Sequence, residues 1–131
     1  MKHKALGQKC WVVPDGFIPQ VTELDKDNRT GYLSHECACL LNTGATDTGI
    51  EVTVYFEDEE PIVIADIVLA ARRCLHLRMD TLETDGVIAI ERGRPYALVI
   101  RADEPIVVQM SRLDTTQPNM GFLSTMAYPI G

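Results

Sequence analysis

The sequence has little that would place it in a membrane, outside the cell or on nucleic acid. Its longest apolar runs, Ile62–Ala65 and Ile67–Ala71, are far shorter than the about 20 residues that a transmembrane helix needs. Met1–Gly16 lacks a basic start followed by an apolar segment, so we expect no signal peptide. Positive charge is also scarce, because 12 Lys and Arg against 19 Asp and Glu give a formal net charge of −7. Such a chain repels duplex DNA and anionic membranes, and we therefore expect a soluble cytoplasmic protein without membrane insertion.

Cysteines and cofactor motifs are sparse as well. Four cysteines in 131 residues are too few for the disulfide framework of a small secreted protein. His35, Cys37 and Cys39 would share one face of a strand, as three ligands for zinc would. A structural zinc site usually has a second pair of ligands, and none is visible, so we predict reduced core cysteines and no metal. No phosphate-binding glycine loop or dinucleotide fingerprint occurs either, and we predict no cofactor.

What the sequence does contain is a succession of short β-branched segments separated by turn signals. The length, with 46% apolar and 24% charged residues, suits one domain covering residues 1–131. Turns are expected between the segments, among them Pro14–Gly16 and Asp103–Pro105. The pattern predicts an all-β fold, a single-domain antiparallel β-sandwich with little or no helix. The predicted strands are Glu36–Leu41, Glu51–Phe56, Ile62–Leu69, Cys74–Met79, Val87–Ile90, Tyr96–Arg101 and Ile106–Leu113.

One stretch, residues 62–82, is ambiguous because it contains neither glycine nor proline. Its apolar residues fit both the alternation of a strand and the stripe of an amphipathic helix. The β-branched Ile62–Val68 favours a strand, whereas Leu69–Leu77 is a better helix former. Periodicity alone leaves both structures open, and a helix here would make the fold α+β.

Polar side chains embedded in the apolar segments are the candidates for function. Charged groups among core strands must find partners, so they could form internal ion pairs, for example Arg72 or Arg112 with Glu36 or Asp114. They could instead line a site for an anionic or polyhydroxylated ligand, or an interface between subunits. The sequence leaves these alternatives open. The groups are Ser34, His35 and Glu36; Arg72, Arg73, His76 and Arg78; and Gln109, Ser111, Arg112 and Asp114.

A set of motifs in a fixed order relates the chain to a known family. The motifs are Cys10-Trp11-Val12, Ser34-His35-Glu36, Leu40-Leu41-Asn42, Ala71-Arg72-Arg73 with His76 and Arg78, the run from Pro105 to Gln109, Ser111-Arg112-Leu113-Asp114, and the run from Leu123 to Tyr128. In these motifs, from about residue 10 to 128, the chain resembles the sensory rhodopsin transducer family. The resemblance implies an antiparallel β-sandwich that assembles as a homotetramer and acts in signalling or ligand binding without catalysis. It also favours two strands in residues 62–79, with a bend near residues 70–73, although Ala70 stands where members often carry proline.

The resemblance further implies a pocket for a sugar or a related small metabolite. The arginines would donate charge-assisted hydrogen bonds to the ligand. Glu36, Asp114 and Gln109 would accept hydrogen bonds from hydroxyls or hold the arginines, and Trp11 would provide an apolar wall. The candidate ligand-binding residues are Trp11, Ser34, His35, Glu36, Arg72, Arg73, His76, Gln109, Arg112 and Asp114.

Three other functions stay open at this point. A membrane photoreceptor would be a suitable partner because its basic cytoplasmic loops would attract an acidic protein. DNA binding would require a local basic patch of Lys2, His3, Lys4, Arg72, Arg73 and Arg94, against the net charge. A small sugar-acting enzyme could use Glu36 and Asp114 as paired carboxylates, which depends on their separation in space.

Overall fold

The computed structural model of the protein describes residues 3–26 and 32–131. Within this part of the chain almost all regular structure is strand, and every strand pairing is antiparallel. The elements in chain order are β1 (Gln8–Phe17), α1 (Glu23–Lys26), β2 (His35–Asn42), β3 (Thr48–Phe56), β4 (Ile62–Leu69), β5 (Arg73–Arg78), β6 (Glu83–Thr84), β7 (Val87–Ile88), β8 (Pro95–Asp114), β9 (Gly121–Met126) and β10 (Tyr128–Ile130).

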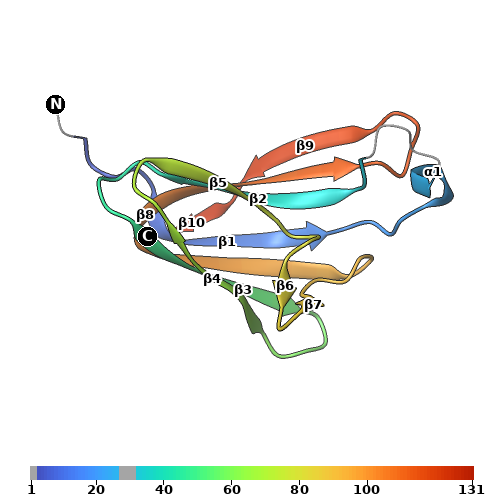
Figure 1. Cartoon of the computed structure of the whole chain (residues 1–131), viewed down its shortest axis with the longest axis horizontal. Helices are drawn as coiled ribbons and strands as arrows, with labels where there is room; N and C mark the ends of the chain where they lie inside the picture. Colours follow the sequence, from blue (N-terminus) through green and yellow to red (C-terminus); the bar gives the residue numbers. More distant parts are fainter. Residues whose placement is uncertain (1–2, 27–31) are drawn as a thin grey trace.

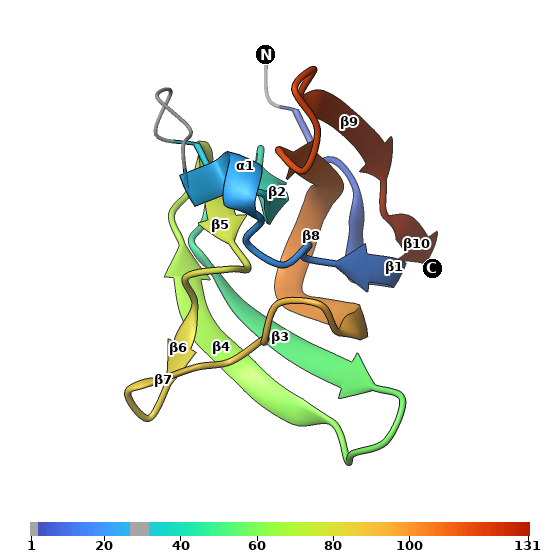
Figure 2. The same cartoon turned by 90° about the vertical axis from the view of Figure 1, so that its right-hand side faces the viewer.

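The long strand β8 organises the fold because it belongs to both layers of a sandwich. Its first half pairs with β1 and β3, and its second half pairs with β2 and β9. One layer therefore has the order β4-β3-β8-β1-β10, and the other has the order β5-β2-β8-β9. Figure 1 shows β8 running along one layer and returning in the other, and Figure 2 shows the layers from the end at which α1 lies. The predicted antiparallel all-β sandwich with little helix is confirmed.

The core lies between the two layers and follows the alternation of the strands. Val52 and Val54 of β3 pack in the core, as do Leu75 and Leu77 of β5, whereas the alternating Glu51, Tyr55, Cys74 and His76 are exposed. This is the division of faces that the sequence predicts for both segments. The large side chains that are fully buried are Ile18, Leu40, Ile50, Val52, Val54, Met79, Ile90, Leu98, Ile100, Ile106 and Val108.

The turn expected at Asp103–Pro105 is wrong, because β8 continues through it. Ala102 still pairs with Ile50 of β3, and Val107 already pairs with Leu41 of β2. Pro105 lies in the short interval between these partners, where its missing N–H costs no ladder hydrogen bond. Turn-forming residues here mark the place where one strand passes between layers.

The turn expected at Pro14–Gly16 is wrong for a similar reason. These residues lie within β1, at an irregularity of the register between Val13 and Gly16. A Cβ atom at Gly16 would stand 2.5 Å from a carbon of the Tyr96 ring, so only glycine lets that ring pack here. The strand that contains them was not among the predicted segments, and neither were β9 and β10.

The ambiguous stretch forms the two strands β4 and β5, which excludes the helix. Because β4 pairs with β3 and β5 pairs with β2, the chain changes layers between them. Arg72 turns the chain with a φ of 56°. The fully buried Asn42 amide supports this turn by donating to the carbonyls of Leu69 and Ala70 at 3.2 and 3.3 Å. The bend expected near residues 70–73 is confirmed. Ala70 replaces the proline that members often carry, and the hydrogen bonds of Asn42 stabilise the bend instead.

Candidate functional site

The predicted site residues do not converge on one place. Glu36 and Arg112 meet on the inner side of their strands, whereas the side chains of His35, His76 and Gln109 line the outer side. The others lie at separate positions in the fold, namely Trp11 in the core, Ser34 before β2, Arg72 and Arg73 at the β4–β5 turn, and Asp114 at the end of β8.

Glu36 and Arg112 form an internal ion pair across β2 and β8. Arg112 Nε lies 2.8 Å from Glu36 Oε2, and the Glu36 side chain is 3% exposed. The other carboxylate oxygen accepts from the Phe17 N–H at 2.6 Å and from the Tyr96 hydroxyl at 2.7 Å. Burial, with the adjacent Glu36 charge, raises the pKa of Tyr96, so this hydroxyl remains a donor. Glu36 and Arg112 therefore form one of the internal ion pairs that the sequence allowed.

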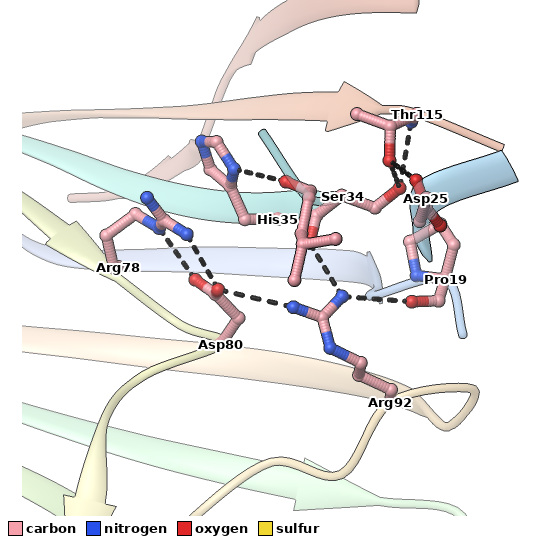
Figure 3. Close-up of polar contacts among 9 residues, drawn as sticks. Pro19, Asp25, Ser34, His35, Arg78, Asp80, Arg92 and Thr115 are labelled. Atoms are coloured by element: carbon pink, nitrogen blue, oxygen red, sulfur yellow. Dashed lines mark hydrogen bonds and ion pairs between the residues drawn. The ribbon is translucent and has the colours of Figure 1, made fainter. Parts of the chain in front are cut away.

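A second polar cluster joins the start of β2 to the end of β8 (Figure 3). Ser34 Oγ accepts from the Thr115 N–H at 2.9 Å and contacts Thr115 Oγ1 at 3.1 Å. The Thr115 hydroxyl donates in turn to buried Asp25, which also accepts from the Thr22 N–H at 2.8 Å. The hydrogen bond from Thr115, followed by those from Thr22, lowers the pKa of Asp25. Ser34 is thus used to fasten α1 to the sandwich.

The same region contains a chain of guanidinium and carboxylate groups (Figure 3). Arg78 donates from Nε and Nη2 to the two oxygens of Asp80, both at 2.7 Å. Arg92 approaches Asp80 at 3.4 Å and donates to the carbonyls of Pro19 and Ser34 at 3.1 and 2.7 Å. Burial would raise the pKa of Asp80, but the hydrogen bond and charge of Arg78 outweigh it and lower this pKa. Arg78 is therefore neutralised by Asp80.

The remaining predicted residues have separate environments. Trp11 is 5% exposed, and its indole N–H donates to the carbonyls of Gln8 and Ile106, both at 3.0 Å, so its ring packs in the core. Asp114 accepts from the N–H and hydroxyl of Thr116 at 2.8 and 2.6 Å. Arg72 and Arg73 are exposed, and Arg72 lies in the turn before β5. Of the polar group Arg72, Arg73, His76 and Arg78, only His76 and Arg78 therefore share one surface, on the outer side of β5.

His35, His76 and Gln109 line a groove of about 470 Å³ on the outer face of the β5-β2-β8-β9 layer. The strand register explains how they meet. Cys39 of β2 is opposite both His76 of β5 and Gln109 of β8, and Ser111 of β8 is opposite Ser124 of β9. Alternate residues of neighbouring strands share a face, so four strands each contribute side chains to one surface. The full lining is His35, Cys37, Cys39, His76, Arg78, Gln109, Ser111, Phe122 and Ser124.

The groove offers hydrogen-bonding groups without a net charge. Its guanidinium, that of Arg78, is balanced by Asp80. Gln109 Nε2 donates to Ser124 Oγ at 3.2 Å and retains its amide oxygen as an acceptor. His35 Nδ1 lies 2.9 Å from the Leu33 carbonyl, which can only accept, so Nδ1 is the donor and Nε2 is left for other hydrogen bonds. The arrangement suits a ligand with several hydroxyl groups.

Cys37 and Cys39, whose thiols line the groove, are free cysteines. Burial, together with the neighbouring Cys39, raises the pKa of Cys37 to about 12. A thiol must be deprotonated to bind zinc, and this pKa opposes deprotonation. Among residues 3–26 and 32–131, no group of three or more His, Cys, Asp or Glu side chains is arranged to hold a metal ion.

Sequence reasoning missed the contribution of β9 to this groove. Phe122 and Ser124 alternate with Leu123 and Thr125, and the two pairs line different cavities. That alternation with a period of two was the available signal, but the segment reads first as a continuous apolar tail. Asp25 was missed as well, although Thr22-x-x-Asp25 has the spacing of a helix capping box.

The described residues contain no helix that is long and apolar enough to cross a membrane. A search of curated proteins finds no match to this chain. Among solved structures, a Thermotoga maritima protein titled "Crystal Structure of Thermotoga maritima 1070" is 31% identical, with a TM-score of 0.80, and the match covers 95% of this chain and 96% of that one. The Anabaena sensory rhodopsin transducer is 35% identical, with a TM-score of 0.70, covering 84% of this chain and 91% of its own. The family model described as "Anabaena sensory rhodopsin transducer" matches residues 6–129. This chain therefore belongs to the Anabaena sensory rhodopsin transducer family.

Proposed function

We propose that this transducer-family protein is a non-catalytic signalling module that binds a neutral, polyhydroxylated small molecule, such as a sugar. The proposed site is the outer groove that contains His35, His76 and Gln109. The observation that carries the proposal is that four strands direct hydrogen-bonding side chains into one hollow of about 470 Å³, a volume within the range of small-molecule sites.

The charge of the groove favours a neutral ligand over an anion. Arg78 is paired with Asp80 by two hydrogen bonds of 2.7 Å, so it has little net charge to offer. His76 is exposed, with no polar contact to the residues that the structure describes, and it can bind a hydroxyl group. The 69% exposed ring of Phe122 adds an apolar surface beside these polar groups.

The absence of catalysis is part of the proposal. The enzyme hypothesis requires Glu36 and Asp114 to face one substrate as a pair of carboxylates. Glu36 is instead buried among donors from Phe17, Tyr96 and Arg112. Asp114 accepts hydrogen bonds from Thr116 at the end of β8.

Isothermal titration calorimetry with neutral monosaccharides tests the proposal, with the corresponding sugar phosphates and uronic acids as charged comparisons. We expect at least one neutral sugar to bind and Gln109→Ala to weaken it about five- to tenfold, the value of one hydrogen bond. Gln8→Ala is the matched control, because Gln8 is an exposed strand glutamine away from the groove. No binding by any sugar, or equal effects of the two substitutions, would refute the assignment.

A second function, coupling to a membrane photoreceptor, is supported by the similarity to a sensory rhodopsin transducer. The net charge of −7 would attract basic cytoplasmic loops and disfavours DNA. Of the basic patch considered for DNA, Lys2 lies outside the described residues. Co-sedimentation of the protein with a rhodopsin in vesicles at low salt tests the coupling, and failure to co-sediment counts against it.

We also propose the homotetramer. Large apolar side chains that do not line the groove are exposed on β4 and β10, among them Val63, Val68 and Ile130. Such clusters are typical of surfaces that another protein covers. Light scattering coupled to size exclusion should give four times the 14.6 kDa of one chain.

A further inference from the structure

A second cavity, of about 390 Å³, lies on the other side of β8 and β9 from the groove. It is lined by residues of β1 on one side and by residues from β9 to the start of β10 on the other. Its lining is largely apolar, with Val12 on one side and Leu123, Met126 and Tyr128 on the other. Its charged lining residues are Glu36 and Arg112, which pair with each other, and the exposed Asp15. The cavity is thus apolar with one ion pair at its base.

Arg112 has unused donors at this base. Its one hydrogen bond to the described residues is from Nε to Glu36, at 2.8 Å. Glu36 is itself held by Phe17 and Tyr96, so the guanidinium is fixed in position. The side chain of Arg112 is 23% exposed, and its terminal nitrogens therefore remain accessible. Two parallel N–H donors on a fixed guanidinium match the two oxygens of a carboxylate.

A carboxylate of the chain itself already approaches this position. Asp15 Oδ1 lies 3.7 Å from Arg112 Nη2, too far for a hydrogen bond, and the Asp15 side chain is 92% exposed. Such a loose pair contributes little free energy, because water screens the charge and the side chain must be ordered. Asp15 can therefore turn into solvent when a better-placed carboxylate arrives.

We propose that this cavity is a second ligand site, for a small amphipathic monocarboxylate. The ligand carboxylate replaces Asp15 on the terminal nitrogens of Arg112, and its apolar body packs against Val12, Leu123 and Met126. Because Glu36 neutralises Arg112, binding depends on apolar burial as well as on charge, which excludes small polar acids. The site and its ligand class are independent of the sugar site proposed for the outer groove.

Calorimetry on the full chain in its native oligomeric state tests the proposal, with 3-phenylpropionate as the probe and its neutral amide as the comparison. We expect the acid to bind at least about tenfold more tightly than the amide, the ratio for a charge-assisted hydrogen bond. Asp15→Asn removes the competing carboxylate and should tighten the acid about two- to fivefold. Asp66→Asn makes the same change of charge at an exposed position of β4, outside the cavity, and should leave the affinity for the acid unchanged.

Two substitutions on β9 distinguish this site from the groove. Leu123→Glu places a carboxylate in the cavity and should abolish binding of the acid, whereas Phe122→Glu points into the groove and should not. Failure of every sugar to bind the unmodified protein, with binding of the acid retained, would overturn the proposed function but leave this inference standing. Equal affinities for acid and amide, no effect of Asp15→Asn, or a probe-dependent change of oligomer mass by light scattering would overturn it; the last result would identify the cavity as a contact between copies of the chain.

Discussion

Strands β2 and β8 carry polar side chains on both faces, and the two faces use them differently. On the inner face, Glu36 and Arg112 are bonded to each other, with Phe17 and Tyr96 completing the set. On the outer face, Gln109 of β8 lies in an open groove beside His76 of β5, and its amide oxygen remains free as an acceptor. Polar groups that are paired inside the protein stabilise it, whereas donors and acceptors without a partner are available to a ligand. The Glu36–Arg112 bond on the inner face therefore stabilises the fold and leaves only the terminal nitrogens of Arg112 free, whereas the outer groups are largely unpaired.

Breaking the inner pair should have the largest effect. Glu36→Ala leaves Arg112 without its partner and removes the acceptor of Phe17 and Tyr96, so we expect the free energy of unfolding to fall by about 3–5 kcal/mol. Urea denaturation measures this change. Gln109→Ala on the outer face is the control, with an expected change within about 0.5 kcal/mol. Similar losses for the two variants would contradict the distinction between the faces.

Asn42 extends the comparison to the far end of β2. Its side chain is fully buried and donates to the carbonyls of Thr46, Leu69 and Ala70. Asn42→Ala leaves these carbonyls unsatisfied, and we expect a loss of about 2–4 kcal/mol in urea denaturation. Ser124→Ala on the outer face should change stability by less than about 0.5 kcal/mol. A loss below 1 kcal/mol for Asn42→Ala would show that the turn holds without the amide.

Acid should weaken the clusters that anchor Ser34 and Arg92. The pKa values of Asp25 and Asp80 lie below 3.8 in the folded protein, so their contribution is present above pH 3.8 and is lost as the pH falls further. The melting temperature should therefore drop steeply below about pH 4. Asp25→Asn should lower stability by about 1–3 kcal/mol at pH 7 and flatten the acid limb. An unchanged dependence of the melting temperature on pH below pH 4 in this variant would show that Asp25 does not contribute to the acid sensitivity.

The smallest effect on stability is expected in the groove. His76 is exposed, so His76→Ala should change the free energy of unfolding by less than about 0.5 kcal/mol. The same variant should weaken the sugar identified by calorimetry about fivefold or more. His3→Ala, at an exposed position outside the groove, is the control. A stability loss comparable to that of Glu36→Ala would make the outer face structural as well.

The fold was predictable to the extent that alternation is local. The division of faces in β3 and β5 follows from the residues themselves and is confirmed. The failures at Asp103–Pro105 and Pro14–Gly16 have one cause, because the same residues that make turns also occur where a strand changes layer or register. β9 was not predicted because apolar residues occur on both of its faces and all of them are exposed, so its sequence does not show one apolar face turned to the core.

The sequence showed which polar residues stand among the apolar strands, but not which of them lie together in space. The chain places Ser34, His35 and Glu36 next to one another, yet they belong to an anchoring cluster, an open groove and a buried ion pair. Adjacent strand residues point to opposite faces, so neighbours in sequence are separated in space. Conversely, His76 and Gln109 are far apart in the chain and meet only through Cys39.

By itself, the sequence determined the all-β class, the inward and outward faces of several strands, the acidic surface and the family resemblance, because composition and period are local properties. Tertiary structure alone decided which cations are neutralised, which polar groups remain free and where cavities open. Those outcomes depend on the register of β2 against β5 and β8 and on the passage of β8 between layers. Register joins segments distant in sequence, and a shift of one residue would exchange the inner and outer faces of a strand.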